Sequence, residues 1–195
     1  IESGTEIIKY IGSEENIVIP SELGGKPVVS IGCYAFCPDI LTEYEINSNK
    51  NHPKNPYIEN TDCAQIKSVT IPESVYYIGC DAFKNCTLLE KVEFTGEGIR
   101  WIDERAFENT ALTEIDIPRT LKGIGYGCFK MTEITNIVFG KNDDNYFEPF
   151  WGAFDDSKIR TVTFKSDGIW IDQAVFDGSC IETIERIVLS TSCHS

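Results

Sequence analysis

Residues 66–83 read IKSVTIPESVYYIGCDAF, and residues 112–129 repeat the same arrangement as LTEIDIPRTLKGIGYGCF. Both stretches place apolar residues at the first, fourth and sixth positions, continue through a proline and end on a phenylalanine. The alternation of apolar and polar residues before the proline predicts a short strand with one buried face. Because proline cannot donate a hydrogen bond to a neighbouring strand, we expect Pro72 and Pro118 to end these strands.

The arrangement recurs along the whole chain. The last apolar position of the strand pattern returns every 22–27 residues from Ile19 to Leu189. The closing phenylalanines are Phe36, Phe83, Phe107, Phe129, Phe154 and Phe176. The interval from Phe36 to Phe83 is about twice the others, so it holds either an insertion or a worn repeat. Because the strand pattern continues at Leu41, Tyr44 and Ile46, we interpret residues 47–65 as a degenerate repeat, which gives about eight rungs.

The repeat length has a direct physical meaning. One unit cannot bury its apolar face alone, whereas stacked copies bury a continuous core. We expect the phenylalanines to fill the space between rungs, and Gly79 and Gly125 to relieve the backbone at a tight corner after each strand. No unit shows the apolar period of a long helix. The sequence therefore predicts a repeat solenoid that is rich in β-structure and has little α-helix.

The repeated phrase resembles the BspA-like leucine-rich repeats over about residues 16–189. The resemblance implies one leucine-rich-repeat domain over residues 1–195, coiled as a right-handed superhelix. Residues 1–15 would form an N-terminal cap and residues 190–195 a C-terminal tail. The family is common in surface and secreted proteins of gut and oral bacteria and of some mucosal protists, where it is associated with adhesion and with binding of host or matrix proteins. No catalytic residues are known to accompany the repeat, so none is assigned.

The charge composition of the chain argues against some classes of binding partner. The chain of 195 residues has 31 acidic and 17 basic residues, a formal net charge of −14 at pH 7. This balance argues against a nucleic-acid partner and against docking on anionic lipid, since both require a basic surface. No apolar run is long enough to insert into a membrane. The sequence has two histidines and lacks the HExxH, GxSxG and phosphate-loop motifs, so we expect no enzyme activity, no metal and no cofactor.

The eight cysteines make up too small a share of the chain for a disulfide-built scaffold. Their pairing cannot be deduced from the sequence. We interpret most of them as small buried apolar residues. The closest pair, Cys33 and Cys37, lacks the spacing and the nearby histidine of a zinc site.

Two polar ladders should line one face of the solenoid, because the third and fifth residues of each strand pattern point outward. The candidate binding residues on these ladders are Glu43, Glu45, Lys91, Glu93, Glu114 and Asp116. They make the N-terminal half of the face acidic. One interpretation is a surface that attracts a basic protein segment or a cation. The other is a solvated face that keeps a long sheet soluble and prevents edge-to-edge association.

An aromatic residue precedes the corner isoleucine in three repeats, at Tyr77, Trp101 and Trp170. Tyr77 and Trp101 should lie on adjacent rungs with their rings nearly stacked. Exposed rings in this arrangement could bind a sugar ring or a partner loop. The alternative is that they pack against a neighbouring turn.

Together these features predict a non-catalytic binding or adhesion module outside the cell or at its surface. Its partner would be an unidentified protein, such as a host or matrix protein, or a glycan. The chain starts at Ile1 and carries no signal segment, so we expect that a targeting segment has been removed or that the chain is part of a longer protein. Two alternatives stay open: a structural spacer within a larger surface protein, and a module that targets a catalytic domain elsewhere in the same chain.

Overall fold

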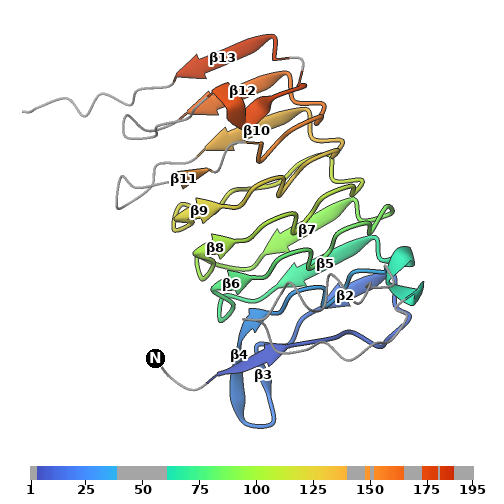
Figure 1. Cartoon of the computed structure of the whole chain (residues 1–195). Coiled ribbons are helices and arrows are strands. Elements are labelled where there is room, and N and C mark those ends of the chain that lie inside the picture. Colours follow the sequence, from blue (N-terminus) through green and yellow to red (C-terminus); the bar gives the residue numbers. More distant parts are fainter. Residues whose placement is uncertain are drawn as a thin grey trace, which may run out of the picture.

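The computed structural model describes residues 4–38, 61–139, 148–149, 152–164, 173–179 and 181–186. The chain winds into stacked turns that place strands on two faces (Figure 1). On the first, which we call the ladder face, β2 (Asn16–Val18), β5 (Ser68–Ile71) and β7 (Lys91–Phe94) form one parallel sheet, and β10 (Asn136–Phe139), β12 (Thr161–Phe164) and β13 (Thr183–Arg186) form another. On the second, which we call the corner face, the order is β1 (Thr5–Ile7), β4 (Lys26–Ile31), β6 (Tyr77–Ile78), β8 (Trp101–Ile102), β9 (Gly123–Ile124) and β11 (Glu148–Pro149).

The remaining elements are short. β3 (Glu22–Leu23) pairs antiparallel with β4. The two 3-10 helices are η1 (Thr61–Gln65) and η2 (Gln173–Phe176). The described residues contain no α-helix. The prediction of a β-rich solenoid with little helix is confirmed.

The strands of the ladder face follow the sequence pattern closely. In β5, Val69 and Ile71 are buried while Ser68 and Thr70 are partly exposed, and the strand ends just before Pro72. Val69 pairs in register with Val92 of β7. Since equivalent positions of successive repeats lie side by side, each apolar position forms a continuous buried column through the core.

The phenylalanines form one of these columns. Successive rings from Phe36 to Phe176 stack with centroid distances between 4.6 and 5.5 Å. Tyr10 stacks on Phe36 at the N-terminal end of the column, at 5.3 Å. The irregular unit at residues 149–154 also contributes its ring, Phe154, to the column. The predicted role of the phenylalanines between rungs is confirmed.

The number of rungs is smaller than predicted. Phe36 stacks directly on Phe83 at 4.6 Å, and Ile17 of β2 pairs directly with Val69 of β5. No rung therefore lies between these partners, and the interpretation of residues 47–65 as a degenerate repeat that adds a rung is wrong. An apolar pattern shows that a segment can form a strand, but long-range packing decides whether it joins the stack. Residues 39–60 lie outside the described residues.

The last rung has a different register from the predicted one. Ile184 pairs with Val162, so Ile184 takes the place that the pattern gave to Ile187. Ile181 packs against the core in the first position of this rung. Arg186 occupies the usual last apolar position, opposite Phe164, and this substitution hides the true register in the sequence.

The corner face carries strands that the sequence did not predict, and its glycines have another role. Gly79 and Gly125 do not have positive φ; the left-handed residues lie two positions later, at Asp81 (φ 54°) and Gly127 (φ 59°). A Cβ on Gly125 would come within 2.4 Å of the backbone nitrogen of Glu104. These glycines therefore permit close approach between adjacent rungs rather than an unusual backbone angle.

The ladder face is interrupted at one rung. β7 is the edge of its three-stranded sheet and β10 is the edge of the next sheet. Between them, residues 112–116 form no strand, and Ile117 makes a single parallel bridge with Phe139. The interruption falls among the predicted binding residues.

Candidate functional site

Lys91 and Glu93 lie on β7 with both side chains exposed, while Val92 between them is buried. Lys91 Nζ is 3.2 Å from Glu93 Oε2, and both side chains are more than half exposed. An ion pair this open to solvent contributes little to stability. It does reduce the net charge of this part of the ladder.

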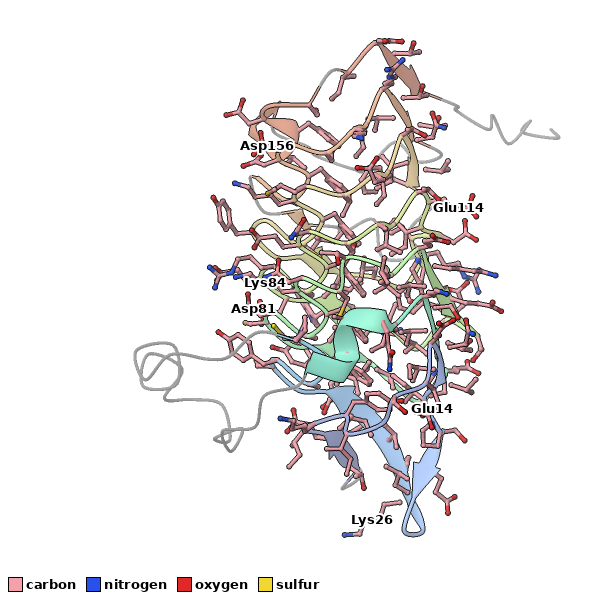
Figure 2. All side chains as sticks on the ribbon, turned by 90° about the vertical axis from the view of Figure 1, so that its right-hand side faces the viewer. Glu14, Lys26, Asp81, Lys84, Glu114 and Asp156 are labelled. Atoms are coloured by element: carbon pink, nitrogen blue, oxygen red, sulfur yellow. The ribbon has the colours of Figure 1, made fainter. Side chains whose placement is uncertain are left out.

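Glu114 and Asp116 lie on the interrupted rung, on either side of the buried Ile115. Both are exposed, and neither has an ion-pair partner among the described residues. In Figure 2, Glu114 projects on the side of the solenoid opposite Asp81, Lys84 and Asp156. The carboxylates of this rung are therefore free to meet an external cation.

The rest of the predicted ladder is only partly described. Glu43 and Glu45 lie outside the described residues, and the direct pairing of β2 with β5 excludes the predicted position of Glu45 between Val18 and Thr70. At the other end, Thr163 is buried although its position was predicted to face outward. The described acidic surface is therefore centred on β7 and residues 114–116.

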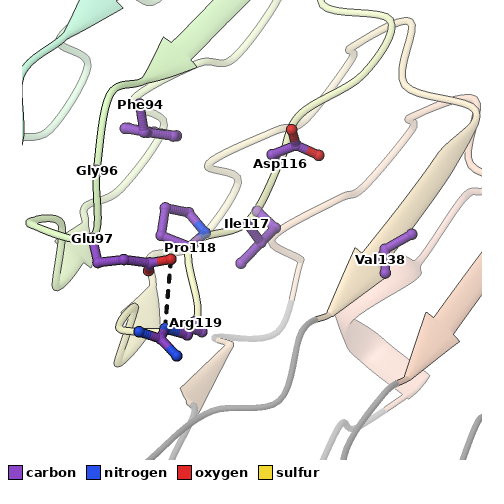
Figure 3. A pocket seen from close by; sticks show the side chains of 8 residues that line it. All are labelled: Phe94, Gly96, Glu97, Asp116, Ile117, Pro118, Arg119 and Val138. Atoms are coloured by element: carbon purple, nitrogen blue, oxygen red, sulfur yellow. Dashed lines mark ion pairs between the residues drawn. The ribbon is translucent and has the colours of Figure 1, made fainter.

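A cleft of about 390 Å³ opens at the interrupted rung (Figure 3). It lies between the end of β7, the chain after residue 115, and β10. Its lining residues are Phe94, Gly96, Glu97, Asp116, Ile117, Pro118, Arg119 and Val138. Phe94, Ile117 and Pro118 are half-buried and Val138 is 39% exposed, so apolar side chains are open to solvent on the floor and far wall.

One wall of the cleft is held by polar contacts. Arg119 Nε lies 3.5 Å from Glu97 Oε1. The Thr120 hydroxyl donates to the backbone oxygen of Glu97 at 2.8 Å. These contacts tie adjacent rungs together below the cleft, while Asp116 stands at the opposite lip (Figure 3). The cleft thus combines an apolar surface with a carboxylate that has no described ion-pair partner.

The predicted aromatic strip is only partly formed. Tyr77 and Trp101 are register partners on β6 and β8, as expected, but the described ring contacts do not include a stack between them. The Tyr77 hydroxyl donates to Asp103 Oδ2 at 2.5 Å, and burial raises the pKa of Tyr77 above its ordinary range. Trp101 is 37% exposed, and Trp170 lies outside the described residues. Tyr77 is therefore partly a structural residue.

The sequence did not predict a buried ion pair on the corner face. Asp81 is 1% exposed, with Arg105 Nε at 3.0 Å from Oδ1 and Lys84 Nζ at 3.6 Å. Burial raises the pKa of Asp81, and the charges of Arg105 and Lys84 oppose that change. Two local signals were available in the sequence, an aspartate and an arginine at equivalent positions of adjacent repeats. Because the Asp81 side chain is enclosed, we interpret its pair with Arg105 as structural.

The described ranges contain no group of three histidine, cysteine, aspartate or glutamate side chains placed to hold a metal ion. In the same ranges, no helix has the length and hydropathy needed to span a bilayer. The absence of metal and cofactor stays a prediction for the whole chain.

The chain matches the model of one known repeat family. Residues 59–185 match the model of the BspA type leucine rich repeat region, in six copies. The chain belongs to this family. The matched range begins after Phe36, and its six copies cover the repeats from Ile66 onward. No curated protein matches the chain.

Solved structures of leucine-rich repeat proteins share the fold. A leucine-rich repeat protein of T. pallidum is 26% identical with a TM-score of 0.65, over 91% of this chain and 71% of that one. A leucine-rich repeat protein of Bacteroides ovatus is 18% identical with a TM-score of 0.56, over 89% and 45%. The pneumococcal vaccine antigen PcpA is 18% identical with a TM-score of 0.57, over 94% and 44%. The chain spans less than half the length of the latter two proteins.

Proposed function

We propose that this BspA-type repeat chain is a protein-binding module, and that its ladder face binds an extended basic segment of a partner protein across the cleft at the interrupted rung. The observation that carries the proposal is the position of Glu114 and Asp116. Both carboxylates are exposed and lack a described ion-pair partner. Asp116 lines the cleft together with Phe94, Ile117 and Val138, and Glu114 lies two residues before it on the same rung.

The chemistry of this surface favours a segment that alternates basic and apolar side chains. Apolar side chains would gain free energy by entering the cleft, whose volume is within the range of small-ligand sites. Lysine or arginine side chains between them would meet the carboxylates along the rung. The net charge of −14 would also attract a basic partner at long range.

The family supports the wider part of the proposal. Leucine-rich repeats typically mediate protein binding and are generally non-catalytic, so an interaction role is favoured over an enzyme. The association of BspA-type repeats with surface and secreted proteins supports a position outside the cell. The alternatives are a structural spacer in a larger surface protein and a module that targets a catalytic domain in the same chain.

The test uses two synthetic octapeptides with fluorescent labels. One alternates lysine and valine, and the other alternates glutamate and valine. Fluorescence anisotropy with the full chain should show saturable binding of the lysine peptide only. Its affinity should fall as salt rises from low to physiological ionic strength, because exposed charges are screened. A spacer predicts no saturable binding of either peptide.

A matched pair of variants locates the binding surface. The double variant Glu114→Lys/Asp116→Lys should weaken the lysine peptide by about tenfold or more, because it reverses the charge at the lip of the cleft. The control Glu22→Lys/Asp177→Lys changes the net charge equally at exposed sites distant from this rung and should have a much smaller effect. Equal losses in the two variants would show that only the overall charge matters and would contradict the proposed site.

The aromatic strip suggests a glycan partner less strongly. Of Tyr77 and Trp101, only Trp101 is exposed, so the described part of the strip offers a single exposed ring. A glycan stays a possible partner of the module. Loss of binding to a glycan array on Trp101→Ala, with the peptide affinity unchanged, would transfer the proposed site to the corner face.

A further inference from the structure

Cys33 and Cys80 occupy equivalent positions on adjacent rungs of the corner face. Each cysteine lies two residues after one member of a register pair, which is formed by Ile31 of β4 and Ile78 of β6. Backbone hydrogen bonds hold the two segments together on both sides of the cysteines. The amide of Gly79 donates to the oxygen of Ile31 at 2.8 Å, and the amide of Tyr34 donates to the oxygen of Cys80 at 3.1 Å.

The two sulfur atoms also meet. The Cys80 thiol hydrogen-bonds to the Cys33 side chain. A Cβ built on Gly79 would lie 3.0 Å from Cys33 Sγ, so this sulfur lies against the neighbouring rung. Both cysteines are partly exposed, whereas the other described cysteines, Cys37, Cys63, Cys86 and Cys128, are buried.

We propose that Cys33 and Cys80 form a disulfide that joins the two rungs when the protein folds in an oxidising environment. Two residues before the cysteines, β4 and β6 are paired at the spacing of neighbouring strands, about 4.7–4.9 Å, which is within the roughly 4.4–6.8 Å that a disulfide requires between Cα atoms. The backbone therefore needs no large movement.

The oxidation balances with a small disulfide such as oxidised glutathione. The thiolate of one cysteine attacks this disulfide and releases one reduced glutathione. The second thiolate then attacks the mixed disulfide and releases another. The protein loses two protons and two electrons, one S–S bond forms in the protein, and the S–S bond of glutathione is reduced.

The disulfide would connect two rungs that are adjacent in the solenoid but far apart in the sequence. Cys33 and Cys80 stand on the two rungs between which the phenylalanine spacing doubles, so a disulfide would close residues 34–79 into a loop. Closing a loop of this length reduces the entropy of the unfolded chain. The inference goes beyond the binding role and draws on the proposed location only for the oxidant, since disulfides persist outside the cytoplasm.

The hydrogen bond to Cys33 and burial raise the pKa of the Cys80 thiol, so little thiolate is present at neutral pH. Exchange in the folded protein should therefore be slow. The test accordingly refolds the full chain at pH 8.5 with oxidised and reduced glutathione, in parallel with a sample kept in reducing agent. Proteolysis under non-reducing conditions and mass spectrometry then identify the linked peptides.

The expected result is one peptide pair that joins Cys33 to Cys80 and separates on reduction. The oxidised protein should melt roughly 5–15 °C above the reduced protein. In Cys33→Ser, oxidant should no longer raise the Tm, whereas Cys128→Ala should keep the shift. Another dominant pairing, or glutathione adducts without the link, would overturn the proposal. Peptide mapping of the unaltered chain decides the matter even if a variant fails to fold, and peptide binding is a separate measurement.

Discussion

At the scale of single residues, the fold is held by side chains that make the same contact in every rung. The clearest case is the phenylalanine column. Phe107 is fully buried between Phe83 at 5.2 Å and Phe129 at 5.5 Å, with almost parallel rings. A smaller example lies three positions after two of the phenylalanines, where the hydroxyls of Thr110 and Thr132 donate to the backbone oxygens of Phe107 and Phe129.

Phe107→Ala should lower the free energy of unfolding by about 3–5 kcal/mol, because it leaves a cavity in the middle of the column. Urea denaturation followed by circular dichroism measures the loss. Phe176→Ala is the control, since Phe176 stacks on Phe154 at the end of the described column and is 8% exposed. It should cost clearly less. Equal costs would show that the column does not act as a continuous core.

The buried pair of Asp81 and Arg105 gives a prediction about pH. Burial already raises the pKa of Asp81, and Arg105 opposes this rise. Arg105→Gln should therefore raise it further and cost about 1–3 kcal/mol at neutral pH, where the unfolded chain carries an ionised aspartate and Lys84 stays near Asp81 in the folded state. A carboxyl group with a raised folded pKa binds its proton more tightly in the folded state, so the difference from wild type should shrink as pH falls toward about 4.

Denaturation at several pH values measures this difference. The double variant Asp81→Asn/Arg105→Gln should lose the pH dependence, because no buried carboxylate is left at that position. Lys158→Gln is the control for an exposed pair with Glu133 at 2.6 Å, and its cost should stay below about 1 kcal/mol at every pH. A pH-independent loss in Arg105→Gln would contradict the assigned role of Asp81.

At the scale of elements, the repeats contribute strands to both faces, and the ladder face is interrupted at one rung. The ladder-face strands could be predicted because their apolar residues alternate. The corner-face strands, such as Tyr77–Ile78, could not, because two residues are too short for a period to appear. What fixes them is backbone hydrogen bonding to the next rung, where the amide of Asp103 donates to the oxygen of Ile78 at 2.9 Å.

Gly125 tests how closely these rungs approach. Gly125→Ala should cost about 2–3 kcal/mol, because its new Cβ would meet backbone atoms of Asp103 and Glu104 that cannot move independently. Gly24→Ala is the control: its φ is +58° but no atom lies within 4 Å of the new Cβ, so about 1 kcal/mol is expected. Urea midpoints compare the two. A larger cost at Gly24 would mean that backbone angle outweighs the approach between rungs.

The difference between local sequence pattern and long-range packing also explains which parts of the site could be predicted from the sequence. Exposure of Lys91, Glu93, Glu114 and Asp116 follows from strand alternation and could be predicted locally. The cleft could not, because it depends on how residues 112–117 meet β7 and β10. The doubled spacing between Phe36 and Phe83 was ambiguous for the same reason, since local pattern does not show which rungs stack.

At the scale of the whole molecule, the solenoid is continuous on one face and divided on the other. The phenylalanine column runs past the interrupted rung. The corner-face strands also continue past it, while the ladder face ends one sheet at β7 and begins another at β10 (Figure 1). Each rung of a repeat protein is stabilised by contacts with the neighbouring rungs. A junction with fewer strand contacts on one face should therefore open more readily than the rest of the solenoid. The cleft lies at this junction, as do Glu114 and Asp116, whose carboxylates have no ion-pair partner among the described residues.

Hydrogen exchange followed by mass spectrometry should detect the division. Amides in β5 and β12 are held in parallel ladders, whereas residues 113–116 belong to no strand. We expect exchange at 113–116 to be at least about tenfold faster, because opening there disrupts few backbone hydrogen bonds. The corner-face segment 123–125 of the same rung is the internal control and should exchange slowly, since it is bonded to the preceding rung. Similar protection of both segments would mean that the rung opens as one unit, and the cleft would then have no special mobility with which to admit a partner.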